Sequence, residues 1–532
     1  MEFVLKFTCI YKIIISIVIT LLTLTSLTYA AGYPVPEPKP VKGDTLVGAY
    51  YFPGWSQEDR WYCLAANDAV QHPLLGYYRE GNPEAADWHI KWALEHGVGF
   101  FSFDFYTEAG SQFIETALDD GFLKAKYIDK FKFCLNWCNH APAEMMTAKE
   151  LERFGDLVIK KYLAHPSYLK IDGKPVLFIL SGYSFVKNLG IEGAKKEFEK
   201  FEQRCKDAGL KGLYLVSCEG YIMGEDNLKD GFAAGIDTFC LYNYPYAGTK
   251  VTGPGKHEEA SYADLVDQGT GLWTHWNNLC KGAFWPTVMP GWDRRPWCKD
   301  ADLLRTGSTP ALFEKSLKSA REHANKDKVV MIEAWNEWGE GSVLEPSVEW
   351  KFGYLDKVRS VFAPKTGSHK DADPKSMGLP LPDFDLRFPN TDTWKFDYNA
   401  DGWHGANTST ISVEGGVLSF TALNGDPQIN SPISYLKCSL YPKVRIRMRV
   451  EAPADTGDKS IGQIFWSTIK QGLSESASEK FEVILDGNWH EYTINLRNNP
   501  MWNGTMDQFR LDPLDVSDAK IIIDEIRFLK AK

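Results

Sequence analysis

The stretch Val329-Val-Met-Ile-Glu-Ala-Trp-Asn-Glu-Trp-Gly-Glu-Gly341 joins an apolar run to a cluster of acidic and aromatic residues. The first part, Val329–Trp335, is short and rich in β-branched residues, which is typical of a strand that is buried on both faces of a parallel sheet. Glu337 and Glu340 follow at its carboxyl end. In (β/α)8 barrels the functional side chains gather at the carboxyl ends of the strands, so this stretch predicts a fold and a place for chemistry.

Upstream of this stretch the chain alternates short apolar runs with amphipathic segments. Seven more runs are candidate strands: Leu46–Phe52, Val98–Phe105, Phe131–Trp137, Pro175–Leu180, Leu213–Ser217, Ile236–Tyr242 and Phe284–Val288. Helical patterns separate them, for example Pro83–His96, Ala148–Leu163, Gly193–Ala208, Tyr262–Lys281 and Pro310–Ala324. Eight such units predict a parallel (β/α)8 TIM barrel over residues 44–363 rather than an open sheet.

The expected strand ends carry polar and aromatic side chains, whereas the strand interiors are apolar. We therefore expect these residues to line a substrate site: Tyr50, Tyr51, Trp55, Asp104, Tyr106, Trp137, Glu219, Tyr242, Tyr244, Trp292, Asp293, Trp335, Asn336 and Trp338. One of Tyr50 and Tyr51 points inward, and Tyr51 looks the more exposed. Asp104 binds either substrate or a buried donor. Asp293 is either a hydroxyl acceptor or part of an Asp–Arg pair, and Asn336 either binds substrate or fixes its loop.

Glu337 and Glu340 are the candidate catalytic residues. Residues three apart on a continuous strand face opposite ways, so the two carboxyls share a site only if the chain turns. Gly339 and Gly341 make such a turn easy. Two carboxyl groups at one site suit glycosidic cleavage, because one protonates the leaving oxygen while the other assists attack at the sugar carbon. A solvated acidic turn or an ion-pair site is the alternative.

Four collinear segments carry a family resemblance. They are Tyr50-Tyr-Phe-Pro-Gly-Trp55, Pro73-Leu-Leu-Gly-Tyr-Tyr78, Pro290-Gly-Trp-Asp293, and Trp335-Asn-Glu-Trp-Gly-Glu-Gly341 with Leu344-Glu-Pro346. Together they resemble the WbsX-like proteins, which are similar to glycoside hydrolase family 99, the endo-α-mannosidases and endomannanases. The resemblance spans the predicted barrel and does not cover the C-terminal part of the chain.

The resemblance implies roles for the acidic pair. Glu337 would be the base and Glu340 the general acid/base of a retaining reaction through a 1,2-anhydro sugar, in which the base deprotonates the 2-hydroxyl of the substrate. Gly339 stands where the family motif has a bulkier residue, often His, and this difference leaves the sugar open. We expect no cofactor.

The N-terminus predicts export. Lys6 and Lys12 precede the apolar run Ile13–Leu27, and small residues follow at Thr28-Tyr-Ala-Ala31. This pattern is typical of a signal peptide, here residues 1–31, and the run is short for a membrane span. We expect a secreted or periplasmic protein that has no membrane anchor after cleavage.

Charge and composition favour some classes of binding partner over others. A net charge of −11 without a basic block gives no support for nucleic-acid binding, and 14% aromatic residues suits a carbohydrate partner. The Cys134-Leu-Asn-Trp-Cys138 segment has no second cysteine pair at metal-binding spacing, so we expect no metal. The oligomeric state and the disulfide pairing remain open.

Beyond the predicted barrel, residues 364–390 lack hydrophobic periodicity and predict a linker. Residues 391–532 alternate in short strands and predict an all-β sandwich, which resembles the jelly-roll modules of glycan-degrading enzymes. Trp403, Trp466 and Trp502 are its candidate stacking platforms. Glycan binding and a purely structural role are both open for this sandwich.

Three functions compete. The first is an exported glycoside hydrolase acting on a polysaccharide or oligosaccharide. The second is a WbsX-type glycosyltransferase in surface-glycan assembly. A signal peptide disfavours it because nucleotide-sugar donors are cytoplasmic, and no Asp-x-Asp motif or phosphate-cradling glycine loop is evident. The third is a non-catalytic glycan-binding protein, which would follow if the two glutamates diverged.

Overall fold

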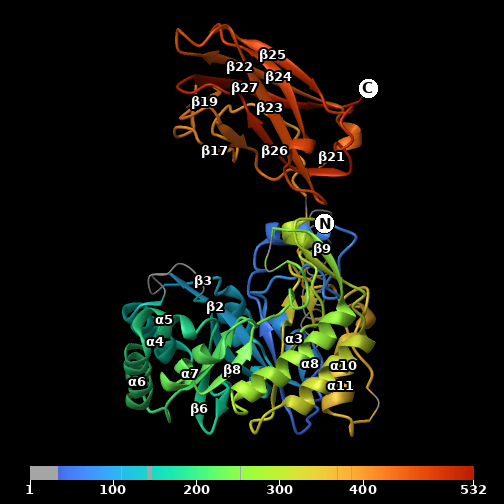
Figure 1. The fold of residues 1–532 in the computed structure, drawn as a ribbon. Helices are drawn as coiled ribbons and strands as arrows, with labels where there is room; N and C mark the ends of the chain where they lie inside the picture. The colour runs from blue at the N-terminus through green and yellow to red at the C-terminus, as the bar shows by residue number, and fades with distance from the viewer. Residues whose placement is uncertain are drawn as a thin grey trace, which may run out of the picture.

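The computed structural model describes residues 34–531 except 109–110, 140–145, 252, 254, 368, 385 and 387. The predicted signal peptide lies outside the described residues. Figure 1 shows a barrel of strands surrounded by helices, with a sandwich of sheets beyond one end of it. Within the described residues, none of the helices has both the length and the apolar character that crossing a membrane requires.

The predicted (β/α)8 barrel is confirmed. Its strands are β1 (Leu46–Tyr51), β2 (Val98–Glu108), β4 (Lys132–Trp137), β6 (Lys174–Ile179), β7 (Tyr214–Glu219), β8 (Thr238–Leu241), the split strand β10 (Phe284–Trp285) with β11 (Thr287–Val288), and β13 (Val329–Ile332). Pro286 divides the split strand because it has no N–H to donate to the ladder. β10 pairs with β8, β11 pairs with β13, and β13 pairs with β1, all in parallel, so the ring closes.

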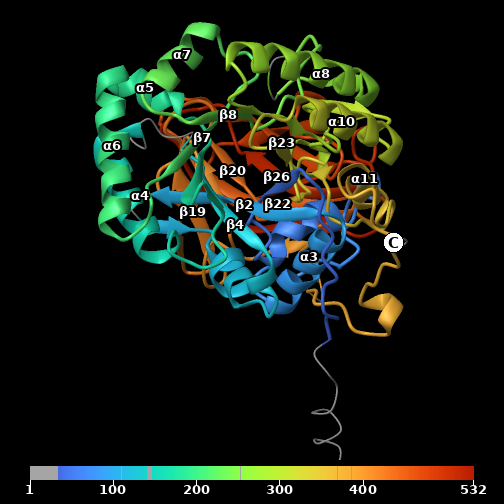
Figure 2. The ribbon, with the colours of Figure 1, turned by 90° about the horizontal axis from the view of Figure 1, so that it is seen from below.

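Helices surround the barrel, as Figure 2 shows from below. They are α3 (Pro83–Glu95), α4 (Ala148–Lys161), α5 (Tyr183–Leu189), α6 (Ile191–Asp207), α7 (Glu225–Ala233), α8 (Tyr262–Leu279), α10 (Pro310–His323) and α11 (Gly353–Phe362). Asn82, Thr147, Ser261 and Thr309 cap four of them by accepting first-turn N–H groups. In α10 the buried residues Phe313, Ser316, Leu317 and Ala320 recur at helical spacing, so one stripe faces the strands.

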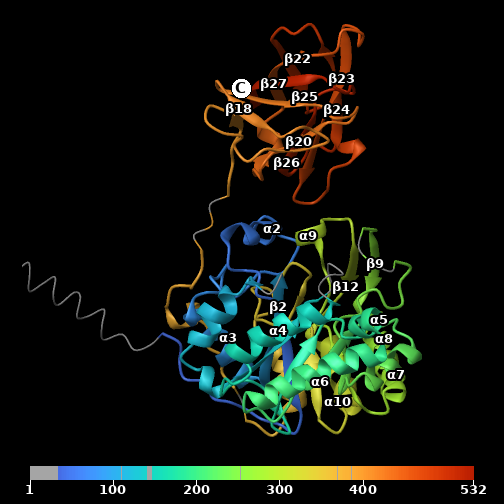
Figure 3. The ribbon, with the colours of Figure 1, turned by 90° about the vertical axis from the view of Figure 1, so that its left-hand side faces the viewer.

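Short elements lie between the barrel strands. β3 (Ser111–Phe113) pairs with the end of β2, and β5 (Lys170–Ile171) pairs with β6. β9 (Glu258–Ser261) pairs with β12 (Leu303–Thr306). Short helices α2 (Tyr62–Ala65) and α9 (Arg295–Cys298) lie on the side of the barrel that faces the sandwich (Figure 3). β14 (Asn336–Glu337) and β15 (Ser342–Val343) form an antiparallel hairpin after β13.

The C-terminal region is an antiparallel all-β sandwich, as predicted. One sheet contains β16 (Thr393–Trp394), β18 (Ser412–Glu414), β19 (Val417–Thr421), β22 (Lys443–Glu451), β25 (His490–Asn495) and β27 (Lys520–Leu529). The other contains β17 (His404–Ala406), β20 (Gln428–Asn430), β21 (Leu436–Lys437), β23 (Lys459–Thr468), β24 (Ser478–Ile484) and β26 (Thr505–Asp512). Strict alternation along β22 buries Val444, Ile446, Met448 and Val450 between the sheets.

The sandwich contacts loops at one end of the barrel. Lys299, directly after α9, forms an ion pair with Asp507 of β26, with 2.9 Å between Nζ and Oδ1. The ring of Tyr62 in α2 lies 5.7 Å from that of Tyr435. The sandwich therefore touches the loops that follow the carboxyl ends of the barrel strands.

Candidate active site

The turn that the two glycines predict is present. Glu337 in β14 pairs with Ser342 in β15, and the chain reverses between them. The N–H of Glu340 donates to the carbonyl of Glu337 at 3.1 Å, which closes the turn. Gly341 has φ +64°, a conformation that a residue with a side chain rarely adopts. The hairpin therefore brings Glu337 and Glu340 to the same end of the barrel.

An indole ring packs against this turn at Gly339. A Cβ atom on Gly339 would lie only 1.9 Å from Cε2 of Trp297 in α9. The Trp297 ring rests on Phe52 and Trp55, at centroid distances of 5.6 and 6.2 Å, and stays 37% exposed. No sequence pattern indicates this role, because Trp297 lies several residues beyond the end of β11. Only the packing against Gly339 identifies it as a neighbour of the acidic pair.

Glu337 is the more enclosed member of the pair. Its side chain is nearly buried, and its Oε2 has no hydrogen-bond partner among the described residues. Burial raises the pKa of Glu337 well above its usual range, and the charges of Glu340 and Asp104 raise it further. Burial and these charges therefore favour the protonated form of Glu337 in the free protein.

Glu340 lies closer to solvent and beside a cation. Its side chain is 15% exposed, and its Oε1 is 3.3 Å from Nε of Arg294. Burial raises the pKa of Glu340 to about 7, although the charge of Arg294 lowers it. Arg294 is held in turn by Asp302, at 2.7 Å. Glu340 can therefore give and take a proton near neutral pH.

Asp104 and its partners form a polar layer inside the barrel. Its carboxylate accepts hydrogen bonds from Nδ2 of Asn136 at 2.8 Å and from the hydroxyl of Tyr242 at 2.7 Å. Burial raises the pKa of Asp104 to about 7, while these two hydrogen bonds lower it. The ring of Tyr50 lies 4.8 Å from that of Tyr242. Tyr50, not Tyr51, is thus the inward-facing tyrosine of β1.

Tyr106 and Glu333 complete the surroundings of the acidic pair. The charge of Glu337 contributes to raising the pKa of half-buried Tyr106, after burial and the charges of Cys138 and Asp104. Glu333 lies deeper and is fully buried, with Ser342 donating to its Oε2 at 2.7 Å. Burial raises the pKa of Glu333 well above its usual range, and the charge of Glu340 adds to this. Four acidic side chains therefore interact, and most of them are protonated at acidic pH.

Five of the predicted site residues are wrong because they face the outer helices instead of the barrel interior: Tyr51, Trp137, Glu219, Tyr244 and Trp335. Tyr51, Trp137 and Glu219 lie on strands, where neighbouring residues face opposite ways, and Tyr244 and Trp335 lie just beyond the ends of β8 and β13. The Tyr51 hydroxyl pairs with Nδ1 of His89 at 3.2 Å. Trp137 stacks on Phe154 of α4 at 4.0 Å.

The other three residues of this group occupy similar positions. Glu219 accepts from the N–H of Tyr183 at the start of α5, at 2.8 Å. Tyr244 packs against Trp273 of α8. Trp335 is fully buried, with its ring 5.6 Å from that of His89 in α3. These contacts attach helices to strands, so the residues support the barrel.

Three further predicted residues position the hairpin. Asn336 accepts from the N–H of Phe52 and donates to its carbonyl, both at 2.9 Å. Nε1 of Trp55 donates to the carbonyl of Asn336, and Nε1 of Trp338 donates to Glu345. Of the two roles considered for Asn336, the structure supports fixing of the loop. All three side chains are buried, and their hydrogen bonds hold the hairpin.

Asp293 forms an ion pair with an arginine, which is one of the two roles predicted for it. Its carboxylate accepts from Nε of Arg295 at 2.8 Å and from Nη2 at 2.6 Å. Its own N–H donates to the carbonyl of Glu340 at 2.6 Å, so Asp293 also braces the turn. Trp292 is 3% exposed, which makes it a buried support beneath Arg294, whose guanidinium lies 5.8 Å from its ring.

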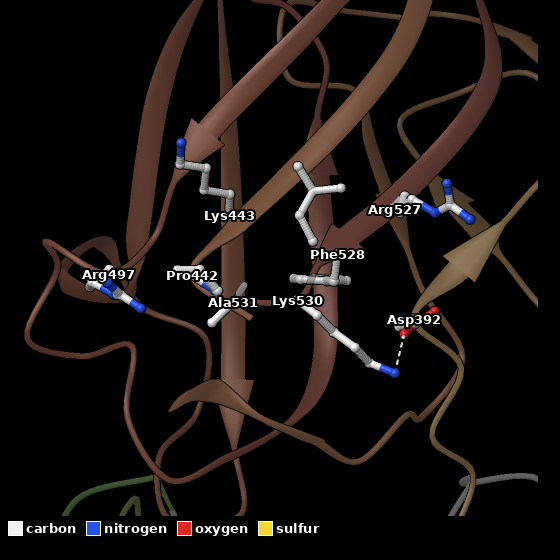
Figure 4. Close-up of a pocket in the computed structure, with 9 residues that line it drawn as sticks. Asp392, Pro442, Lys443, Arg497, Arg527, Phe528, Lys530 and Ala531 are labelled. Atoms are coloured by element: carbon white, nitrogen blue, oxygen red, sulfur yellow. Dashed lines mark ion pairs between the residues drawn. The ribbon is translucent and has the colours of Figure 1, made fainter. Parts of the chain in front are cut away.

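The sandwich shows no aromatic platform at the predicted places. Trp403, Trp466 and Trp502 are 4%, 0% and 7% exposed, so these rings belong to the core between the sheets and the prediction is wrong. A hollow of about 670 Å³ opens elsewhere on the sandwich (Figure 4). Its lining includes Lys443, Arg497, Arg527, and Lys530, which forms an ion pair with Asp392 at 3.6 Å. This basic hollow is separate from the acidic pair.

Asp104→Asn is expected to flatten the pH dependence of stability. The folded pKa of Asp104 is about 7, above its ordinary 3.8. Its protonated form thus stabilises the fold at acidic pH, and this advantage is lost as pH rises from about 4 through about 7. Between these two pH values, one such group changes the free energy of unfolding by about 1.4 kcal/mol per pH unit. Urea unfolding at several pH values tests this, with exposed Asp300→Asn as control; equal slopes in wild type and Asp104→Asn contradict it.

This chain is similar in sequence to known proteins. The family model described as glycosyltransferase WbsX matches residues 68–358. The uncharacterized protein WxcX of Xanthomonas campestris pv. campestris is 23% identical over 312 residues, which are 54% of this chain and 42% of WxcX. The match thus spans less than half the length of that relative.

Two solved structures show similarity over different shares of the chain. The GH99 endo-alpha-mannosidase from Bacteroides thetaiotaomicron is 20% identical, with a TM-score of 0.41, covering 59% of this chain and 94% of its own. The xylan binding module CBM86 from Roseburia intestinalis is 17% identical, with a TM-score of 0.18, covering 25% of this chain and 92% of its own.

Proposed function

The chain belongs to the WbsX glycosyltransferase family, and from that premise we propose that this member is an exported glycoside hydrolase. Its substrate would be a polysaccharide or oligosaccharide. The observation that carries the proposal is the β14–β15 hairpin, which gathers Glu337 and Glu340 at the carboxyl ends of the barrel strands. Two adjacent carboxyl groups with raised pKa values match the two proton-handling tasks of glycosidic cleavage.

We assign Glu340 as the general acid/base. Its pKa of about 7 lets it protonate the leaving oxygen and then deprotonate an incoming water. Its partial exposure lets both the leaving group and the water reach it from solvent. The charge of Arg294 favours the ionised form of Glu340, so both the protonated and the ionised form are present for the two steps of the reaction.

We assign Glu337 as the base that helps the substrate's own 2-hydroxyl to attack the anomeric carbon. In a retaining route through a 1,2-anhydro sugar, this base takes the proton of the substrate's 2-hydroxyl. Glu337 suits the position because its Oε2 is unpartnered and available to a hydroxyl. It must first lose the proton that burial favours, so activity is expected to be low at acidic pH and to increase towards neutral pH.

Trp297 supplies an aromatic face beside the pair. Sugar rings bind to aromatic rings through their C–H faces, and the Trp297 indole is 37% exposed next to the catalytic turn. Asp104, Tyr106 and Tyr242 are the remaining predicted residues that lie with the pair, and they are proposed to bind substrate hydroxyls. The combination favours a glycan over a charged or purely apolar substrate.

Glycosyl transfer is the second candidate, because the family is described by that activity. The same carboxyl pair can serve either reaction, since a sugar hydroxyl can replace water as acceptor. Export, proposed from the N-terminal sequence, favours hydrolysis because nucleotide-sugar donors are cytoplasmic.

The deciding experiment incubates the purified protein with α-mannan, other polysaccharides and their oligosaccharides, and separately with nucleotide-sugar donors and acceptors. New reducing ends that vanish in Glu337→Gln and Glu340→Gln support hydrolysis. Glu322→Gln, on the exposed face of α10, is the matched control and should retain full activity. Product that forms only with a nucleotide-sugar donor overturns the proposal in favour of transfer, and unchanged turnover in both variants removes the pair from the mechanism.

A further inference from the structure

Three potential metal ligands meet on the barrel side opposite to the acidic pair. His96 follows α3, where the chain enters the amino-terminal end of β2, and His369 and Asp371 follow α11. One ligand atom from each of the three lies within 4.8 Å of the other two. Within the described residues, no other group of three or more such side chains is as close together.

The distances between the ligand atoms of these three side chains fit one small metal ion. Nε2 of His96 is 3.2 Å from Oδ1 of Asp371, and Nε2 of His369 is 3.1 Å from the same oxygen. Ligands of tetrahedral Zn²⁺ at about 2.0–2.1 Å from the metal are about 3.3 Å apart. The three atoms are therefore already placed close to their separations around a bound ion.

One atom of each of these three side chains is buried without a hydrogen bond. Nε2 of His96, Nε2 of His369 and Oδ1 of Asp371 are buried atoms that make no hydrogen bond within the described residues. His96 is fully buried. Burying three polar atoms without hydrogen bonds is costly, and a cation at their centre removes that cost.

The other nitrogen of His96 is fixed as in known metal sites. Its Nδ1 lies 2.7 Å from the carbonyl of Trp92, an acceptor, so Nδ1 carries the proton and donates. In the neutral ring this leaves the Nε2 lone pair directed at the carboxylate of Asp371. Metal-binding histidines usually donate their second N–H to a carbonyl or carboxylate in this way, which orients the ring.

We propose that His96, His369 and Asp371 bind a structural Zn²⁺ ion that fastens the start of the linker to the barrel. Two histidine nitrogens and one carboxylate oxygen are a ligand set that zinc prefers. Candidates for the fourth ligand are Asp356, whose Oδ1 is 3.7 Å from Nε2 of His96, and Glu95, whose Oε2 is 3.4 Å from Nε2 of His369.

The neighbouring contacts indicate a structural role. Nε1 of Trp92 donates to the carbonyl of Ala372 at 2.8 Å, and Nη2 of Arg359 donates to that of Gly367 at 3.1 Å. These bonds hold the segment on both sides of His369 and Asp371 against α3 and α11. A zinc ion would join the same segment to His96 and restrict where the linker can leave the barrel.

The test measures zinc in full-length protein that carries no histidine tag. The protein is stripped with a chelator, reloaded with Zn²⁺, desalted, and analysed by elemental mass spectrometry and thermal unfolding. We expect about one zinc per chain, a higher Tm after loading, and at least ~10-fold weaker zinc binding in His369→Ala and in Asp371→Ala. Both residues lie in the partly exposed linker, so the variants are expected to fold.

His257→Ala is the matched control, because that histidine is half exposed and lies outside the cluster. It should bind zinc as the wild type does. Wild-type protein that retains no zinc and shows no Tm change overturns the proposal and leaves His96 as a protonated partner of Asp371. Equal zinc binding by wild type, His369→Ala and Asp371→Ala also overturns it. Neither result depends on the hydrolase assay.

Discussion

Glu340→Gln is expected to lose activity on the natural glycan and to keep the first step, departure of the leaving group, on a glycoside with a good leaving group. Fluoride or nitrophenolate departs without a proton, so the first step no longer needs an acid at position 340. General acid–base catalysis contributes roughly 10²–10⁴-fold, which sets the expected loss on the natural glycan. Glu337→Gln should be inactive on both substrates, because attack at the sugar carbon still needs its base.

The measurement uses activated glycosides of the sugar found in the polysaccharide screen. Release of fluoride or nitrophenolate during the first turnover is followed for wild type, both variants and the Glu322→Gln control, because later turnovers also need Glu340 to deprotonate water. The ratio of the two rates in each variant separates the two roles, because a misfolded protein loses both activities equally. The opposite pattern, with Glu337→Gln active on the activated substrate, would exchange the assignments of the two glutamates.

Gly339→Ala is expected to reduce activity on the order of 10²-fold, because its Cβ would overlap the Trp297 ring at 1.9 Å. Either Trp297 swings away or the turn shifts and carries Glu340 with it. If the ring moves, Gly339→Ala and Trp297→Ala remove the same interaction, so the double variant should be no worse than the poorer single one.

Kinetics on the screened glycan check this prediction. Trp297→Ala alone should mainly raise KM, by roughly tenfold for the loss of one stacking contact. Gly271→Ala in α8 is the matched control, since nothing lies within 4 Å of the added Cβ and activity should not change. Fully additive losses in the double variant would show that Gly339 and Trp297 act separately.

Much of the fold follows from the sequence, because buried parallel strands read as apolar runs. All eight strands lie where they were expected, and the errors are at their ends. The expected strand Val329–Trp335 ends at Ile332, because Glu333 and the residues after it turn into the hairpin. The apolar run Phe284–Val288 did not reveal that Pro286 splits it, since both halves still take part in the barrel.

The sequence predicts the two carboxyl groups of the site, Glu337 and Glu340, but fewer of the residues around them. Alternation along a strand shows that neighbours face opposite ways, but not which one faces inward. Asn136 was therefore missed while its neighbour Trp137 was chosen, although Asn136 is the residue that donates to Asp104. An aromatic ring suits the helix-facing side of a strand as well as a sugar site, and this explains most of the errors.

Residues that come together only in the folded protein cannot be identified from local sequence patterns. Trp297 and Gly339 belong to loops after different strands, and no local pattern links them. The same holds for His96 and His369, which are separated by most of the barrel. Metal sites with short spacing can be found in a sequence, whereas this cluster needs the linker to lie against α3.

The ion pair between Lys299 and Asp507 has a consequence for how the two parts of the molecule stay together. Both side chains keep some contact with solvent, at 21% and 16% exposure. Such pairs contribute up to about 1 kcal/mol, and mobile ions screen them over roughly 8 Å at physiological ionic strength. Lys299 is also two residues from Trp297. Added salt should therefore loosen the sandwich from the loop that carries the aromatic face, and long glycans should sense ionic strength more than short ones.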